Sequence, residues 1–91
     1  MTKDELSMVG FEIVAYSGDA RSTLLSLLKE MRAGNFENVE EKLKEADENI
    51  NLAHQSQTKI LQQEARGEDM EMGFIFFHGQ DHLMTTILLR D

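Results

Sequence analysis

Hydrophobic residues recur along this chain at steps of three and four, the spacing of helices that bury one face. The first stripe predicts a helix over about residues 3–32, opened by Thr2 and Glu5, which match a capping box. Gly10 and Gly18 interrupt this helix, and because glycine is unfavourable in a helix interior, we interpret them as points where a neighbouring helix comes close. For Gly18 the alternative is space left for a ligand or partner. The stripe consists of Leu6, Val9, Ile13, Tyr16, Ala20, Leu24, Leu27 and Met31.

Two further helices follow, each after a glycine. Gly34 is predicted to stop the first helix and Asn35 to cap the second, which extends over about residues 36–66. After Gly67, the third helix is predicted over about residues 69–91, with an acidic first turn that suits the helix dipole. Short connections place sequential helices antiparallel, so the predicted fold is an all-α, up-down-up three-helix subunit. The stripe of the second helix consists of Val39, Leu43, Ala46, Ile50, Ala53 and Ile60.

The third helix is apolar on more than one side, and a polar cluster interrupts it. His78 and His82 share one face, Asp81 lies on a neighbouring row, and Gln80 stands among them. An unpaired polar group costs about 1–3 kcal/mol to bury, so this turn is expected to face water in a cleft or to meet a partner. Gln57, on the second helix, is predicted to line the same cleft or interface. The apolar rows consist of Phe76, Leu83 and Ile87, and of Phe77, Met84 and Leu88.

Composition narrows the function classes. The 91 residues indicate one domain, residues 1–91, whose small core is marginal alone, so self-association is expected. A net charge of −8, without any basic stripe, argues against nucleic acid as a partner. No apolar run approaches the roughly 20 residues of a membrane span, the first residues lack the pattern of a secretory signal, and cysteine is absent. A cytoplasmic location is the expectation that follows.

Four blocks of sequence, spread over essentially the whole chain, resemble one protein family. That family is the lactose and cellobiose class of enzyme IIA components of the bacterial phosphoenolpyruvate-dependent sugar phosphotransferase system. The resemblance implies a homotrimer of three-helix subunits, a nine-helix bundle with active sites between subunits. Family members carry several more helical turns after the equivalent of Asp91. The blocks are GFEIVAYSGDARS (Gly10 to Ser22), AHQSQT (Ala53 to Thr58), EARGED (Glu64 to Asp69) and HGQDHLMTTILL (His78 to Leu89).

The resemblance also implies roles for individual residues. His78 is expected to accept a phosphoryl group from the histidine-containing phosphocarrier protein and to pass it to a sugar-specific enzyme IIB, as a phosphotransferase component. Asp81 of each subunit is expected at the trimer axis, where a divalent cation, magnesium, binds. No organic cofactor is implied, and contact with a membrane is expected only through the transporter component. The matching blocks favour the lactose branch over the cellobiose or chitobiose branch.

A relay of this kind suits imidazole chemistry. Neutral imidazole is nucleophilic and is the form present near physiological pH. We interpret Gln80 and Gln57 as candidate hydrogen-bond donors to phosphoryl oxygens, and His82 as a group that steadies charge or orients His78. Gly79 is expected to leave room for an incoming phosphohistidine.

Two other function classes are compatible with the sequence. His78 and His82, with Asp81 nearby, have a helical spacing suited to zinc, although no HExxH pattern is present and a closed site needs another ligand. The stretch from Gly34 to Ile50 resembles one helix of a tetratricopeptide repeat, which would indicate a non-catalytic scaffold, but no repeat of that period is visible. For His54 a structural role is favoured over a place in the site.

Overall fold

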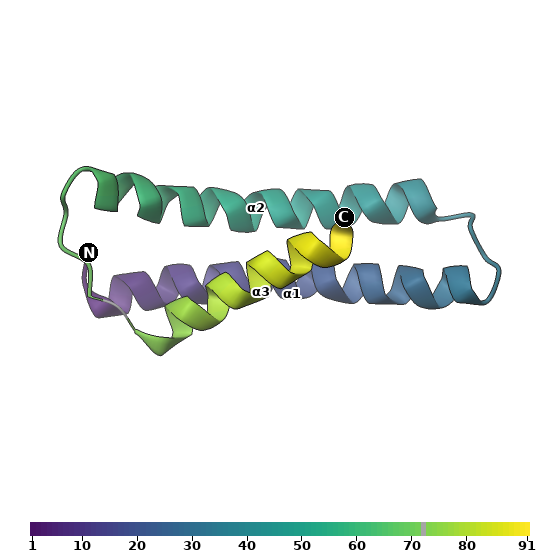
Figure 1. The fold of residues 1–91 in the computed structure, drawn as a ribbon, viewed down its shortest axis with the longest axis horizontal. Helices are drawn as coiled ribbons and strands as arrows, with labels where there is room; N and C mark the ends of the chain where they lie inside the picture. Colours follow the sequence, from purple (N-terminus) through teal and green to yellow (C-terminus); the bar gives the residue numbers. More distant parts are fainter. Residues whose placement is uncertain (72) are drawn as a thin grey trace.

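Three helices make up the computed structural model, which describes residues 1–71 and 73–91. They are α1 (Lys3–Arg32), α2 (Val39–Ala65) and α3 (Phe74–Arg90). In Figure 1, α1 and α2 lie antiparallel, while α3 crosses α1 obliquely and ends near the middle of the molecule. These two ranges of the chain contain no strand, so the predicted all-α three-helix subunit is confirmed.

The first helix begins and ends where the pattern predicts. The Glu5 N–H donates to the Thr2 hydroxyl (3.1 Å) and the Thr2 N–H donates to Glu5 Oε1 (3.2 Å), so both halves of the capping box are present. Beyond the other end, Gly34 adopts φ +85°, a left-handed conformation that disfavours residues with a side chain. Local signals therefore set both ends of α1.

The second helix starts later than predicted, because Asn35, its predicted cap, forms a turn before the helix instead. The Asn35 side chain accepts a hydrogen bond from the Glu37 N–H (3.1 Å) ahead of the helix. The helix begins at Val39, after Asn38, whose side chain makes no capping hydrogen bond. Gly67, with φ +81°, follows its end, close to the predicted position.

The third helix begins at Phe74, so the prediction that it starts near Asp69 was wrong. The segment before it is bonded to the N-terminus of the chain. The Met1 amine donates to the Asp69 carbonyl oxygen (2.6 Å), and the Glu71 N–H donates to the Met1 carbonyl oxygen (3.3 Å). The first bond takes the Asp69 carbonyl oxygen, which a helix starting at Asp69 would bond to the N–H four residues later. Met72, inside the predicted helix, lies outside the described residues.

The first helix packs against both of the others, and two glycines allow its close approach to α3. A Cβ on Gly10 would lie 3.0 Å from the Phe76 Cα, and a Cβ on Gly79 would lie 2.9 Å from the Gly10 carbonyl oxygen. The close approach predicted at Gly10 is therefore confirmed, whereas a Cβ on Gly18 would meet nothing within 4 Å. The core contains Leu6, Ile13, Ala20 and Leu24 from α1, Ala46, Ile50, Ala53 and Ile60 from α2, and Phe76 and Leu83 from α3.

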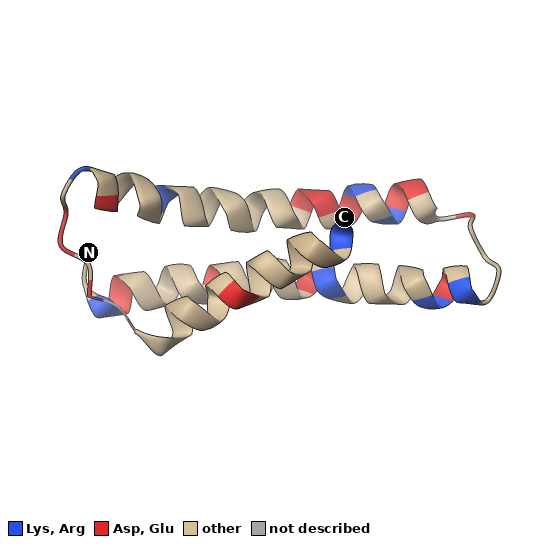
Figure 2. Cartoon of the chain, viewed as in Figure 1, with Lys and Arg blue, Asp and Glu red and all other residues tan. Residues whose placement is uncertain are grey.

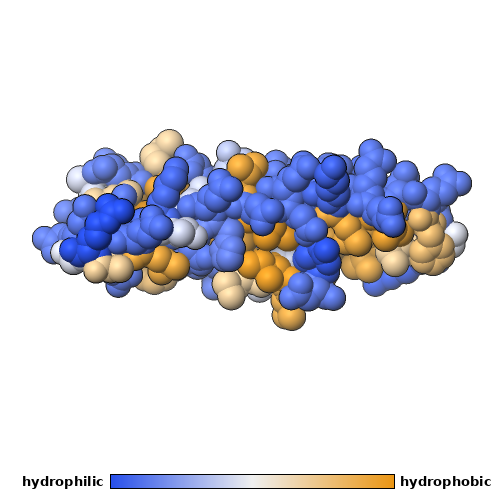
Figure 3. Space-filling model, turned by 90° about the horizontal axis from the view of Figure 1, so that it is seen from above, coloured by the Kyte–Doolittle hydropathy of each residue, from blue (hydrophilic) through white to orange (hydrophobic). Residues whose placement is uncertain are grey.

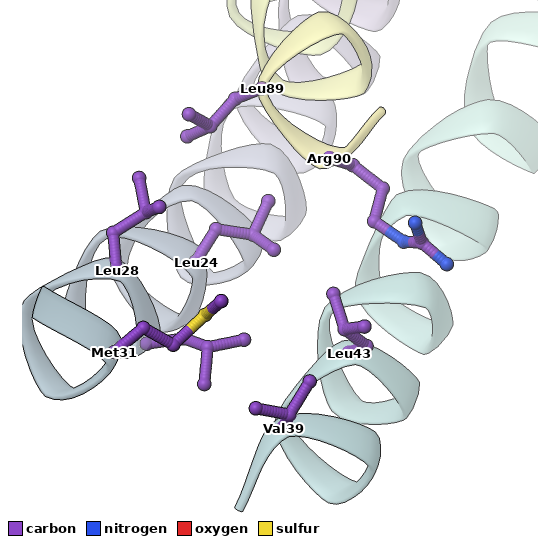
Figure 4. A pocket seen from close by; sticks show the side chains of 8 residues that line it. Leu24, Leu28, Met31, Val39, Leu43, Leu89 and Arg90 are labelled. Carbon is purple, nitrogen blue, oxygen red and sulfur yellow. The ribbon is translucent and has the colours of Figure 1, made fainter. Parts of the chain in front are cut away.

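An apolar pocket of about 180 Å³ lies where α3 ends (Figure 4). Side chains of all three helices point into it, from Leu24 and Leu28 of α1, Leu43 of α2 and Leu89 of α3 among others. Beside it, Arg90 forms two hydrogen bonds (2.7 and 3.1 Å) with the carboxylate of Asp47 and so ties the end of α3 to α2. This pocket is aliphatic, and from α3 it is lined by Leu89 and Arg90 and by neither histidine, so it is not the candidate polar site.

The surface of α3 differs from that of the other helices. Figure 2 shows many charged residues on α1 and α2, whereas α3 carries only Asp81 and Arg90. Its outward face is apolar: Phe74 is 86% exposed and Leu88 is 76% exposed. Figure 3 shows such apolar areas, in orange, within a mostly hydrophilic surface. The prediction that α3 is buried on more than one side is therefore not met within a single chain. Among the described residues, no helix is long and apolar enough to cross a membrane.

Candidate functional site

His78 and His82 lie one turn apart on α3, and their rings are in contact. The ring centroids are 4.6 Å apart and the ring planes are inclined by 49°. His78 is exposed, and His82 is half-buried. The pair therefore exposes one imidazole to solvent, while the second, in ring contact with the first, is partly covered.

Its surroundings favour the neutral form of His82. Partial burial lowers the pKa of His82 below its usual value of 6.5, and the positive charge of Arg21 lowers this pKa further. His78 has the same effect, whereas the carboxylate of Asp81 has a smaller, opposite effect on the pKa. At physiological pH, His82 therefore keeps one ring nitrogen that can accept a hydrogen bond.

Arg21 is the residue at this site that the sequence analysis did not select. It extends from α1 to α3, where Nη2 donates to the His82 carbonyl oxygen (3.1 Å) and to the Thr85 hydroxyl, and Nε donates to the Thr86 hydroxyl (3.3 Å). Two features of the sequence could have drawn attention to it. Arg21 is a cation at the edge of the hydrophobic stripe, and Thr85 and Thr86 are adjacent hydroxyl residues in an apolar segment. Neither feature indicates which helix the arginine contacts.

Gln57 and Gln80 are brought together, but on another side of α3. Gln57 Nε2 donates to Gln80 Oε1 (2.5 Å), which links α2 to α3. Side chains two residues apart on a helix project about 200° apart, so Gln80 and His78 lie on opposite flanks of α3. Within one chain these two glutamines therefore point away from His78, and their contact with a phosphoryl group stays a prediction.

The structure gives Gly79 a different role from the one expected. Gly79 is buried against α1, with the Gly10 backbone where its side chain would lie. Its missing side chain therefore permits helix packing and does not open space for an incoming phosphohistidine. His54, the third histidine, lies exposed on α2 and not on the helix that carries the other two.

Asp81 lies on the exposed apolar face of α3. Phe77, Met84 and Leu88 surround it at helical spacing, with exposed fractions of 54%, 56% and 76%. The described part of the chain contains no group of three or more ligating side chains that could hold a metal ion. This face of α3 therefore offers a single carboxylate, and the zinc hypothesis lacks a ligand set among the described residues.

Comparisons with known proteins identify close relatives of this chain. A family model described as the lactose/cellobiose-specific IIA subunit of the PTS system matches residues 8–91. The lactose-specific EIIA component of Streptococcus mutans is 52% identical over 91 residues, which is 100% of this chain and 88% of that protein. The lactose-specific EIIA component of Staphylococcus aureus is 46% identical over the same shares of the two chains.

Solved structures agree with this similarity. PtcA from S. mutans matches with a TM-score of 0.93 and 43% identity, over 99% of this chain and 88% of PtcA. The cellobiose-specific enzyme IIA from Bacillus anthracis matches with a TM-score of 0.87 and 37% identity, over 91% and 76% of the two chains. The match of the family model, supported by these relatives, shows that the chain belongs to the lactose/cellobiose-specific IIA family of the phosphotransferase system.

Proposed function

We propose that this protein relays phosphoryl groups from the histidine-containing phosphocarrier protein to a sugar-specific enzyme IIB, with His78 as the residue that is phosphorylated. The observation that carries this proposal is the exposed imidazole of His78, in ring contact with His82, on a chain of the IIA family. Relatives 46% to 52% identical are lactose-specific components, which supports lactose as the transported sugar. Cellobiose or chitobiose is the alternative, since a cellobiose-specific protein shares the fold.

The first transfer exchanges one N–P bond for another. An unprotonated ring nitrogen of His78 attacks the phosphorus of the donor's phosphohistidine. The N–P bond of the donor breaks, and the donor nitrogen keeps its electron pair. Because like bonds are exchanged, the step has a small free-energy change and runs in both directions. The second transfer then moves the phosphoryl group from His78 to the nucleophile of enzyme IIB.

Neighbouring polar groups suit these two transfers. In this proposal a neutral His82, in ring contact with His78, offers a ring nitrogen that can accept a hydrogen bond from the ring N–H of His78 during transfer, which would leave the other His78 nitrogen unprotonated for attack. Gln80 and Gln57 are the candidate donors to phosphoryl oxygens. Since they lie on another flank of α3 within one chain, a contact from either glutamine requires a site formed between subunits.

A homotrimer with nine helices is the proposed assembly. The apolar outward face of α3 supports it, because a contiguous exposed apolar face indicates an interaction surface. Phe11 and Leu25 of α1, with exposed fractions of 56% and 51%, add to the apolar surface available for contacts between subunits. The face of α3 consists of Phe74, Phe77, Met84 and Leu88, with Asp81 among them.

Asp81 is the proposed metal ligand of this assembly. Three copies of its carboxylate would meet at the threefold axis, where their mutual repulsion and the burial of charge are both unfavourable. Asp81 forms no ion pair with any described residue, so its oxygens are available. Carboxylate oxygens suit a hard divalent cation such as Mg²⁺, which would neutralise the three charges.

Phosphorylation of the purified protein tests the relay. The protein is incubated with the phosphorylated phosphocarrier, and intact mass is measured for the wild type and for His78→Ala, with His54→Ala as the matched control on the exposed face of α2. The wild type and His54→Ala are expected to gain one acid-labile phosphoryl group per chain, and His78→Ala none.

Two results would contradict the assignment. Full phosphorylation of His78→Ala would move the site to another histidine, and His82→Ala would then be measured. A folded wild type that gains no phosphoryl group would refute the relay itself. Metal analysis of the same sample would then test the zinc hypothesis, which requires about one tightly bound ion per chain.

A further inference from the structure

Arg21 joins α1 to the turn of α3 that follows His78. The arginine is half-buried, and its contacts reach three residues of one helical turn, 61 to 65 positions away in the sequence. They are the His82 carbonyl oxygen and the hydroxyls of Thr85 and Thr86. The guanidinium therefore binds both the backbone and the side chains of the helix that carries the two imidazoles.

The hydroxyls that receive these bonds direct their own protons to backbone carbonyl oxygens. Thr85 Oγ1 has the carbonyl oxygens of Asp81 (2.7 Å) and His82 (3.4 Å) as acceptors, and Thr86 Oγ1 donates its proton to the Ser17 carbonyl oxygen (3.4 Å). Each hydroxyl then presents only lone pairs to Arg21, which has donors alone. Three bonds from one guanidinium to one turn of α3 are compatible with few rotations of that helix, so the network favours one orientation of α3 against α1.

Other contacts between α1 and α3 are less directional. Gly10 and Gly79 let the helices come close, and Phe76 and Leu83 bury apolar surface. Apolar burial depends on area and hardly on angle, whereas a planar guanidinium accepts few arrangements of its acceptors. The fork of Arg21 is therefore suited to set the rotation of α3 about its axis.

The charge of Arg21 is not used in an ion pair. In the described ranges, the carboxylate ion pairs are those of Lys42 with Glu45 and of Arg90 with Asp47. The second of these already fixes the far end of α3 to α2. Arg21 instead donates hydrogen bonds to neutral oxygen atoms of His82, Thr85 and Thr86. This arrangement suits a residue that positions the two histidines better than one that only stabilises the bundle.

We propose that Arg21 is a positioning residue for phosphoryl transfer. By binding the turn of residues 82–86, it fixes the rotation of α3 and so orients His78 and His82 toward an incoming phosphoryl donor. This inference rests on the proposed function of His78. In-line transfer needs the reacting atoms about 3–3.5 Å apart and aligned, so a small rotation of α3 slows it.

Kinetics of phosphoryl transfer test this role in Arg21→Gln and Arg21→Lys, with Arg66→Gln as the control at an exposed position after α2. Rates are measured at a temperature where circular dichroism shows each protein folded. Both Arg21 variants are expected to lower kcat roughly tenfold and to leave KM for the phosphocarrier nearly unchanged, because alignment is lost but the docking surface is kept. Arg66→Gln is expected to transfer at the wild-type rate.

The contact between Arg21 and Thr86 allows a second, independent test of the proposal. Thr86→Val keeps the buried volume but removes the acceptor, so it should lower kcat in the same way, and its combination with Arg21→Gln should lower kcat by less than the product of the two effects. Millimolar guanidinium should restore part of the rate in Arg21→Ala, and equal sodium chloride should not. A wild-type kcat in Arg21→Gln, or an effect on KM alone, would overturn the proposal.

Hydrogen exchange of the unphosphorylated protein separates this inference from the proposed relay. Amides of residues 78–86 should exchange faster in Arg21→Gln than in the wild type, and amides of α2 should not change. If the wild type is not phosphorylated, the relay fails, whereas unchanged exchange at residues 78–86 would refute the positioning role whatever the outcome for the relay.

Discussion

At the scale of single residues, different residues set the distance and the orientation between α1 and α3. Glycines decide how closely the helix backbones approach, and Arg21 with its threonine partners decides how they are oriented. Neither property is visible in a hydrophobic stripe, because the stripe reports only which face is buried.

Gly79→Ala is expected to destabilise the protein by about 1–3 kcal/mol, because the added Cβ meets the Gly10 backbone oxygen at 2.9 Å and α1 must shift. Gly18→Ala is the matched control, since its Cβ meets nothing within 4 Å of the same chain. That change is expected to stabilise the helix by up to about 1 kcal/mol. Urea denaturation measures the free energy of unfolding of both variants. Equal stabilities would show that the close contact with α1 does not require glycine at position 79.

These glycines also show how far sequence reasoning reaches at this scale. The cost of glycine inside a helix predicted a close approach at both Gly10 and Gly18, and the structure confirms it only at Gly10. Gly79 was assigned to the partner side because it follows His78 directly, yet neighbouring positions on a helix point about 100° apart. Arg21 was not selected for a related reason: its partners are distant in the sequence, and only the packing of α3 on α1 brings them within reach.

At the scale of the helices, the ends that depend on local signals were the ones predicted correctly. Thr2 and Glu5 cap α1 through bonds that span three residues. The start of α2 was misplaced because Asn35 suits either a cap or a turn, and its own sequence neighbours do not decide between them. The start of α3 was misplaced because the Met1 amine, 68 positions away in the sequence, takes the Asp69 carbonyl oxygen that a first helical turn would use.

The capping box predicts a dependence of stability on pH. The backbone N–H and hydroxyl of Thr2 lower the pKa of Glu5 from its usual value near 4.5. A lowered pKa means that the unfolded chain takes up the proton first, so the contribution of Glu5 is complete above about pH 4.5 and is lost as the pH falls through its pKa in the folded protein.

Comparison with Glu5→Gln measures this contribution, since glutamine keeps a hydrogen-bond acceptor and does not titrate. The free energy of unfolding of the wild type should fall relative to the variant as the pH is lowered from 6 toward 3, a range of roughly 1.5 pH units on either side of the usual pKa. Parallel curves for the two proteins would show that the Glu5 carboxylate does not stabilise α1.

At the scale of the whole molecule, the second apolar row of α3 remains unburied by its own chain. Periodicity predicted burial on more than one side but could not indicate which chain covers the second side. Phe77, Met84 and Leu88 are each more than half exposed, and Asp81 lies among them. In the proposed trimer this row becomes an interface, with the carboxylate as its one charged element.

Asp81→Leu is therefore expected to strengthen association, because it removes charge repulsion and adds about 1.5–3 kcal/mol of apolar burial per chain. Chelation of divalent cations should weaken the wild-type trimer and leave the variant unaffected. Sedimentation equilibrium with and without chelator measures both effects, and Glu48→Leu on the exposed face of α2 is the control for an added leucine. Weaker trimers in Asp81→Leu would place this residue away from the axis.

The elongated outline of the subunit has a practical consequence for such measurements. The chain measures 50 × 20 × 16 Å, and its radius of gyration of 15.1 Å exceeds the value of about 12 Å typical of a compact domain of this length. A rod meets more friction than a sphere of equal mass. A single chain will therefore leave a gel-filtration column ahead of globular standards of its own mass, and elution volume alone will overstate the number of subunits.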